Sequence, residues 1–297
     1  MLRSSENRES RICCTSAPYV RRSIAVAVTI AGIAACASVV PRQETAAPRE
    51  HRLRVMSYNI QYGNEGLDSV IAVINDQKPD IVGLQEVDVH WNARSAFVNQ
   101  AELLAKGTGM EFRFARIYQL PNEDPSKPVR EFGVAVLSKY PIKSFTNHNI
   151  TRLSTQDSTP VPAPLPGFLE AVVDVNGTPV RVLNVHLDFR RDPGVRRQQV
   201  GEMLAAMGTS DVPTLMFGDM NARPDAPELE PLFQRVSDSW PYRQGPGLTG
   251  PARNPAGKID YVLMSDAFRV TRTWVPKVYA SDHFPVVAEL VLTRSLK

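Results

Sequence analysis

Two short runs rich in apolar residues constrain the fold of this chain more than any other feature of its sequence. They are Ile81–Leu84 and Thr214–Phe217, which are flanked by polar residues, glycine or proline. Four residues make only about one turn of a helix, so each run instead suits a β-strand that is buried on both faces. Strands of this kind need a layer of structure on either side, which predicts a layered α/β core.

Strand and helix patterns mix along residues 51–297, and no internal repeat interrupts them. Asn176-Gly177 between two apolar strands is a strong signal for a hairpin. Strands outnumber helices, and hairpins mix with crossover connections, which predicts one domain of two sheets packed face to face with helices outside. Besides the two short runs, strands are expected at 53–60, 112–117, 133–138, 169–175, 180–187, 259–264, 268–274 and 286–292, helices at 66–77, 98–106, 195–207 and 227–233, and loops at 120–129 and 158–167.

The N-terminal segment has the features of an export signal. Arg21-Arg22 precede an apolar run, Ile24–Ala35, that is too short for the roughly 20 residues of a membrane-spanning helix. Its end, Ile33-Ala34-Ala35-Cys36, resembles a bacterial lipobox, in which Cys36 would be lipidated and become the mature N-terminus. We therefore expect a lipoprotein-type signal peptide at 1–36, a disordered tether at 37–50 and one folded domain at 51–297, exported to the bacterial cell envelope or secreted. A signal peptide cleaved without lipidation, or a short uncleaved anchor, is the alternative.

Charge and cysteine content limit what the domain can be. From His51 onward there are 27 basic and 27 acidic residues and no cysteine, so the domain needs neither a disulfide nor a thiolate metal site. A neutral domain gives no electrostatic support for tight binding of duplex nucleic acid. A local strip could still contact phosphates, although a solvated helix face is the simpler interpretation of these arginines: Arg190, Arg191, Arg196 and Arg197.

Polar residues at the ends of the apolar strands are the candidate functional residues. A carboxylate such as Glu86 after a buried strand is costly unless it is paired or bound to a cation. Each residue alone has a simpler explanation, because Asn and Asp often cap turns and a histidine within a strand is often buried and satisfied. Their joint occurrence is the stronger signal. The candidates of this kind are Asn59, Glu86, His186, Asp219, Asn221, Asp282 and His283.

Six short motifs in a fixed order contain these residues. The series resembles the motifs of the endonuclease/exonuclease/phosphatase family, which includes deoxyribonucleases, AP endonucleases, neutral sphingomyelinases and inositol polyphosphate phosphatases. The resemblance covers roughly residues 53–293 and implies a deoxyribonuclease-like four-layer α/β sandwich of two mixed β-sheets. The motifs are Met56-Ser57-Tyr58-Asn59, Leu84-Gln85-Glu86-Val87, Asn184-Val185-His186-Leu187-Asp188, Gly218-Asp219-Met220-Asn221, Lys258-Ile259-Asp260-Tyr261 and Ser281-Asp282-His283-Phe284-Pro285.

The resemblance also implies a role for each site residue in hydrolysis of a phosphoester. Asn59, Glu86 and Asp282 would bind Mg²⁺, with Mn²⁺ as an alternative, because they offer oxygen donors to a hard cation. The other five would act on water and phosphate. Asp219 would orient or deprotonate the attacking water and Asn221 would hold it or the phosphate, while His283, oriented by Asp260, would donate to a phosphoryl oxygen and His186 would be a general acid or second positive clamp.

The resemblance leaves the substrate open. AP endonucleases usually have a tyrosine where this chain has His186, so the motif argues against that branch. We expect a metal-dependent phosphodiesterase or phosphatase, and the alternatives are a secreted nuclease acting on DNA or RNA, or a non-catalytic surface lipoprotein that uses the fold for binding. The loops that would select the substrate, residues 120–129 and 158–167, contain no recognisable motif.

Overall fold

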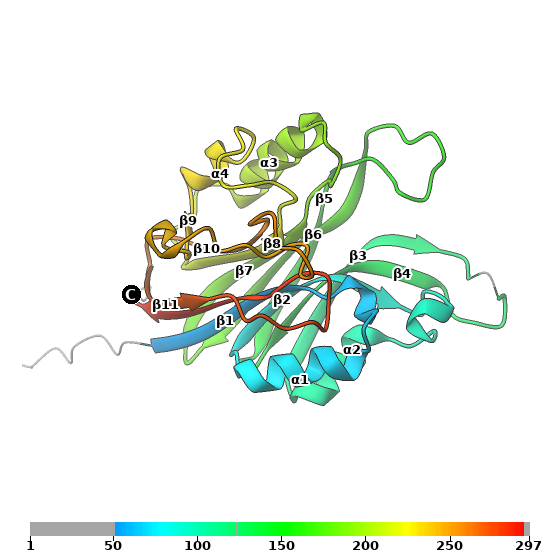
Figure 1. Ribbon diagram of the computed structural model, residues 1–297, viewed down its shortest axis with the longest axis horizontal. Helices are drawn as coiled ribbons and strands as arrows, with labels where there is room; N and C mark the ends of the chain where they lie inside the picture. Colours follow the sequence, from blue (N-terminus) through cyan, green and yellow to red (C-terminus); the bar gives the residue numbers. More distant parts are fainter. Residues whose placement is uncertain (1–50, 123, 294–297) are drawn as a thin grey trace, which may run out of the picture. The chain divides into compact units, whose positions relative to one another are not determined.

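The computed structural model describes residues 51–122 and 124–293, so the expected signal peptide, Cys36 and the tether lie outside the described residues. In this part of the chain, no helix is both long enough and apolar enough to cross a membrane. The described strands form two six-stranded sheets (Figure 1).

The first sheet has the strand order β11-β12-β1-β2-β4-β3. Its strands β1 and β2 are parallel and are joined through helix α1 (Leu67–Gln77), whereas the other neighbours are antiparallel. The sheet is therefore mixed, as expected. Its strands are β1 (His51–Asn59), β2 (Ile81–Val89), β3 (Glu111–Leu120), β4 (Arg130–Ser138), β11 (Phe268–Trp274) and β12 (Val286–Leu292).

The second sheet has the order β5-β6-β7-β8-β10-β9 and is also mixed. The parallel pair here is β7 and β8, joined through α3 (Gly194–Met207). The predicted hairpin between β6 and β7 is present, and Asn176 and Gly177 both have positive φ values, 52° and 89°, as a type I′ turn requires. The strands are β5 (Ile142–Arg152), β6 (Ala163–Val175), β7 (Thr178–His186), β8 (Thr214–Asp219), β9 (Ser237–Asp238) and β10 (Asp260–Met264).

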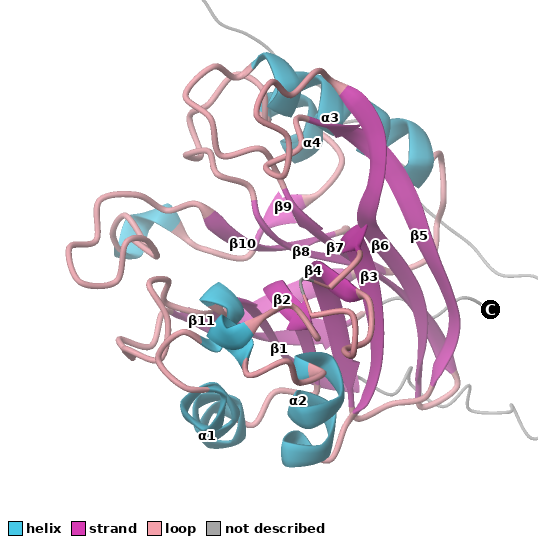
Figure 2. Ribbon diagram, turned by 90° about the vertical axis from the view of Figure 1, so that its right-hand side faces the viewer, coloured by secondary structure: helices cyan, strands magenta, loops and turns pink. Residues whose placement is uncertain are grey.

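Three buried clusters give the layers their order. The largest lies between the two sheets and joins side chains such as Val55 and Val134 of the first sheet to Val173 and Phe217 of the second. A second cluster packs α1 and α2 (Gln100–Thr108) against the outer face of the first sheet. A third packs α3 and α4 (Glu230–Phe233) against the second sheet (Figure 2). The predicted four-layer α/β sandwich is confirmed.

Two predicted loop and helix boundaries are wrong for local reasons. The segment 158–167 is a loop only in its first part, because β6 begins at Ala163 and includes two prolines, Pro164 and Pro166. This part of β6 pairs with β5 before the pairing with β7 begins at Leu169, so it is locally an edge, where proline is tolerated. Helix α2 passes Gly107 and ends at Thr108, and the next residue, Gly109, forms the C-cap with a left-handed φ of 68°.

Strand β1 connects the start of the domain to the candidate site. It begins at His51, pairs there with Leu292 near the end of β12, and ends at Asn59. The parallel neighbour β2 brings Gln85 beside Asn59 in register. The chain thus enters the sheet at one end of β1, and the first predicted site residue lies at the other end.

Candidate active site

Three predicted site residues lie in one row across the second sheet. His186 at the end of β7 is in register with Asp219 at the end of β8, and Asp219 is in register with Asp260 at the start of β10. Side chains that are directly opposite on neighbouring strands point to the same face of a sheet. The topology therefore places one imidazole and two carboxylates together at the edge of the sandwich.

Asp219 lies at the centre of this group and is 1% exposed. Its Oδ2 accepts a hydrogen bond of 3.0 Å from Asn59 Nδ2, and its Oδ1 accepts one of 2.9 Å from the Asn221 backbone amide. Burial raises the pKa of the Asp219 carboxyl, and the negative charge of Asp260 raises it further. His283, His186 and Asn59 oppose this shift only in part. A buried carboxylate with a raised pKa is suited to accept a proton.

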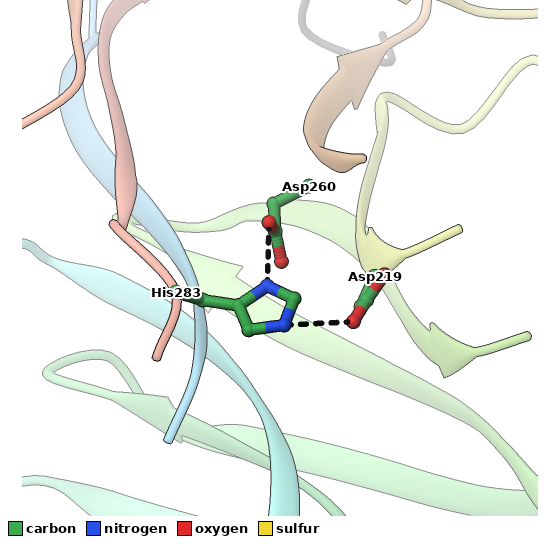
Figure 3. Close-up of side chains that lie close together, drawn as sticks. All are labelled: Asp219, Asp260 and His283. Atoms are coloured by element: carbon green, nitrogen blue, oxygen red, sulfur yellow. Dashed lines mark hydrogen bonds and ion pairs between the residues drawn. The ribbon is translucent and has the colours of Figure 1, made fainter. Parts of the chain in front are cut away.

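His283 lies between the two carboxylates of the row (Figure 3). Its Nδ1 is 2.9 Å from Asp260 Oδ2, and its Nε2 is 3.7 Å from Asp219 Oδ2. Burial alone would lower the pKa of His283, but the charges of Asp260 and Asp219 outweigh burial and raise the pKa to about 11. The imidazole is therefore held in a fixed orientation with a proton available on the face toward Asp219.

Glu86 reaches the same site from the first sheet through a β-bulge. The register between β2 and β4 shifts between Leu84 and Val87, and Glu86 has a left-handed φ of 57°. The apolar run alone suggested that the strand ends before Glu86. In the structure β2 continues to Val89. Bulges bend a strand and redirect a side chain. Here the side chain turns toward the second sheet, where Glu86 Oε1 lies 4.0 Å from His186 Nε2.

Asp282 provides a second carboxylate near Glu86. Burial raises the pKa of Asp282; the neighbouring His283 lowers it, and the negative charge of Glu86 raises it again. A carboxylate whose charged form is disfavoured by burial and a nearby negative charge is stabilised by a cation. Oxygen donors of this type fit a hard divalent ion such as Mg²⁺.

Asn59 lies at the end of β1, as expected, and three hydrogen bonds fix the orientation of its amide group. The amide nitrogen donates to Glu86 Oε1 at 3.0 Å and to Asp219 Oδ2 at 3.0 Å. The amide oxygen accepts from the backbone amide of Gln61 at 3.0 Å. In this orientation Asn59 positions both carboxylates, and its oxygen is engaged by the backbone.

The tightest group of metal-type ligands differs from the predicted metal trio. Asp219, Asp260 and His283 have ligand atoms within 4.8 Å of one another, whereas Asn59, Glu86 and Asp282 were the predicted ligands. In that tighter group both ring nitrogens of His283 face carboxylates. The imidazole of His283 already joins the two acids in that group.

Several residues that hold the site together were not predicted as site residues. The Thr249 hydroxyl accepts from the backbone amides of Ile259 and Asp260, at 3.1 and 3.2 Å. The Ser281 hydroxyl donates to the Asn59 carbonyl at 2.7 Å. Both are fully or almost fully buried. Ser281 lies within one of the six motifs, although it was not named as a site residue.

The strip of arginines near α3 is not one solvated face. Arg196 is buried and forms an ion pair of 2.9 Å with Glu228. Arg190 pairs with Asp188 in the turn after β7. The charges of these two arginines are therefore largely neutralised within the protein.

The sequence matches one protein family over most of its length. Residues 56–283 match the model of the "Endonuclease/Exonuclease/phosphatase family". The chain belongs to this family. The matched range contains all eight predicted site residues, from Asn59 to His283. A comparison with curated proteins found no significant sequence match.

Solved structures show the same fold at low sequence identity. An endonuclease/exonuclease/phosphatase from Beutenbergia cavernae is 24% identical, with a TM-score of 0.66, over 82% of this chain and 72% of that one. A mannosyl-6-phosphatase from Bacteroides thetaiotaomicron is 18% identical, with a TM-score of 0.59, over 80% and 99%. The human Nocturnin catalytic domain with bound sulfate is 19% identical, with a TM-score of 0.56, over 83% and 98%.

Family membership establishes the general chemistry. Members of this family are phosphoester hydrolases and are typically dependent on a divalent metal. The chain is therefore a phosphoester hydrolase in general terms, and the described residues include an acidic and histidine cluster of the type that holds a metal.

Proposed function

We propose that this protein is a Mg²⁺-dependent hydrolase that cleaves a phosphodiester or phosphomonoester by in-line attack of water. The observation that supports this most is the position of His283, held by Asp260 at 2.9 Å and facing Asp219 at 3.7 Å, beside the carboxylates of Glu86 and Asp282. A base, a proton donor and a cation site then surround one small space. The retention of all these groups argues against a non-catalytic binding protein.

Glu86 and Asp282 would hold the ion, with Asn59 fixing the orientation of Glu86 through its amide nitrogen. A divalent cation bound there supplies positive charge beside a non-bridging phosphate oxygen and offsets the charge that develops during attack.

Asp219 would take the proton of the attacking water as the new oxygen–phosphorus bond forms. Its raised pKa favours this role. Asn221, whose side chain donates to the Leu187 carbonyl at 3.0 Å, lies beside Asp219 and would hold the water or the phosphate. His283 would donate a hydrogen bond to a phosphoryl oxygen, and His186 would give its proton to the leaving oxygen as the old bond breaks.

The test combines metal removal with two substitutions. EDTA should abolish hydrolysis of a bis-aryl phosphate or of another member of a phosphoester panel, and Mg²⁺ or Mn²⁺ should restore it. Asp219→Ala and His283→Ala should each lower the rate by at least about a hundredfold. Rates like the wild type in both variants, or the absence of Mg²⁺ binding in calorimetry, would contradict the proposal.

We also propose that the chain acts in the bacterial cell envelope, anchored through a lipid on Cys36. The support is the apolar run that ends in Ile33-Ala34-Ala35-Cys36. In the native host, Cys36→Ala should move the protein from the membrane fraction to the soluble fraction. A protein that stays with the membrane after this substitution would be held by something other than the Cys36 lipid.

A further inference from the structure

A pocket adjoins the candidate active site on the side of Glu86 and His186, which form one of its walls. The rest of its lining comes from β3, β4, α3, the end of β5 and the segments that follow β5 and β7, including Tyr118, Phe132 and Phe189. The described loop residues of 120–129 and 158–167, expected to select the substrate, are not part of this lining. Because the pocket is continuous with the site, it is available to the organic group of a bound phosphoester.

The two arginines of this pocket already form hydrogen bonds or ion pairs within the protein. The Arg152 guanidinium donates to the carbonyls of Pro166, His186 and Gly167 at 2.9–3.1 Å. Arg190 pairs with Asp188 and lies 5.1 Å over the ring of Phe189. Each of these cations therefore already has a partner within the protein, and neither is left over to bind a second phosphate or a carboxylate on the substrate.

The neutral polar groups of the pocket are engaged in the same way. The Tyr118 hydroxyl accepts from the backbone amide of Thr155 at 2.9 Å. The fully buried Gln199 accepts from the Asp188 amide and donates to the Thr151 carbonyl, at 2.9 and 2.8 Å. A substrate rich in hydroxyl groups would lose hydrogen bonds to water on entering and regain few of them.

The surfaces that remain for contact are aromatic and apolar. Tyr118 and Phe132 are stacked, with ring centroids 6.1 Å apart and planes inclined by 20°. Phe189 is 62% exposed at the rim. The cavity volume is about 170 Å³, close to the roughly 150 Å³ of an apolar cavity that accommodates benzene. The space fits one ring.

We propose that this pocket binds a single uncharged aromatic ring of the substrate, so that the enzyme prefers phosphoesters of aromatic or nucleobase-bearing alcohols. This inference rests on the proposed function, because it assigns the organic group of the same substrate. Phe189 is the specificity-determining residue at the rim, and Tyr118 with Phe132 forms the fixed wall. The aromatic alcohol and the nucleoside share the same chemistry, an uncharged planar ring.

The experiment compares esters of similar intrinsic reactivity, as monoesters and as methyl diesters. The alcohols are benzyl alcohol, cyclohexylmethanol, glycerol and a nucleoside through its 5′ hydroxyl. We expect kcat/KM for the benzyl or nucleoside ester to exceed that for the glycerol ester by at least about tenfold, in line with stacking on aromatic side chains. The benzyl and nucleoside arms then distinguish the two sources of the ring. Equal rates for benzyl and glycerol esters, or a preference for the cyclohexylmethyl ester, would overturn the proposal.

Variants of Phe189 test the assignment of the residue. Phe189→Ala should raise KM for the ring-bearing ester by about tenfold with little change in kcat, while Phe189→Tyr should retain wild-type values. Phe145→Ala is the matched control, because Phe145 is an exposed phenylalanine, 38% accessible, that does not line the pocket. An equal effect of the two alanine variants would contradict a specific role for Phe189.

A binding measurement separates this inference from the proposed function. Benzylphosphonate should bind about tenfold more tightly than methylphosphonate in calorimetry, and Phe189→Ala should remove the difference. This result would support the ring pocket even if no ester were hydrolysed. A lack of hydrolysis would count against the proposed function and not against the ring pocket. Equal binding of the two phosphonates would refute the ring pocket, whatever the turnover.

Discussion

Asn184 offers the most direct test of how the fold positions Glu86. It lies in β7 of the second sheet, is fully buried, and its side chain reaches across to the first sheet. Its amide nitrogen donates to the carbonyls of Leu84 and Ala135, at 2.9 and 2.8 Å. Its oxygen accepts from Gln85 Nε2 at 2.7 Å. Leu84 and Gln85 directly precede the bulged Glu86, so this one side chain fixes the bulge to the opposite sheet.

Asn184→Leu would remove all three hydrogen bonds while keeping a similar side-chain volume. Each buried polar group left without a partner costs about 1–3 kcal/mol. Three such groups give a loss of about 3 kcal/mol in the free energy of unfolding at the low end of that range, measured by urea denaturation. Because the bulge is released, the affinity for Mg²⁺ in calorimetry should fall as well.

The matched control is Asn75→Leu, which removes one exposed hydrogen bond to the Gly107 carbonyl. That change should stay within about 0.5 kcal/mol, as surface substitutions do. If Asn184→Leu costs no more than Asn75→Leu, the idea that Asn184 fixes the bulge is wrong. If it destabilises the fold but leaves Mg²⁺ affinity unchanged, Asn184 stabilises the sandwich without positioning Glu86.

Three further predictions concern other parts of the molecule. Asp260→Asn should lower kcat by about 10- to 100-fold with KM nearly unchanged, because the site histidine loses its charged partner; an unchanged kcat would contradict this. Gly83→Ala would place a methyl group 2.3 Å from Phe217 Cβ in the sandwich core and should cost at least about 1–3 kcal/mol in urea denaturation. Burial raises the pKa of Glu170, but hydrogen bonds and charge from partners led by Arg181 outweigh it and hold that pKa below its usual range. The ion pair therefore stabilises fully above the ordinary carboxyl pKa and is lost as pH falls through the lower folded value, so Glu170→Gln should destabilise more at pH 7 than at pH 3.

Much of this architecture was predictable because buried strands and tight turns have strong local signals. The apolar run Ile81–Leu84, the Asn176-Gly177 turn and the helix over residues 66–77 each specify their element through their own residues. Strand β5 had no such signal, because all of residues 143–149 are exposed or partly exposed. Its place in the sheet is decided by pairing with β6, a long-range contact that local pattern does not contain.

In the site, too, the features with a local sequence signal were predictable and those that depend on long-range contacts were not. Motif order predicted Asp219, Asp260 and His283, and the structure brings them within hydrogen-bond and ion-pair distances. The positive φ of Glu86 could not be predicted, because it belongs to a bulge in the pairing of β2 with β4, and that pairing is a long-range contact. The aromatic pocket was also invisible in the sequence, since its residues come from separate strands and no shared spacing marks them.

The path of β1 has a consequence for access to substrate. Eight steps of about 3.3 Å separate His51 from Asn59, so the two ends of the strand are roughly 26 Å apart. A tag or fusion partner attached through the residues before His51 therefore joins the domain at the end of β1 remote from Asn59, and it leaves the catalytic edge free for substrate.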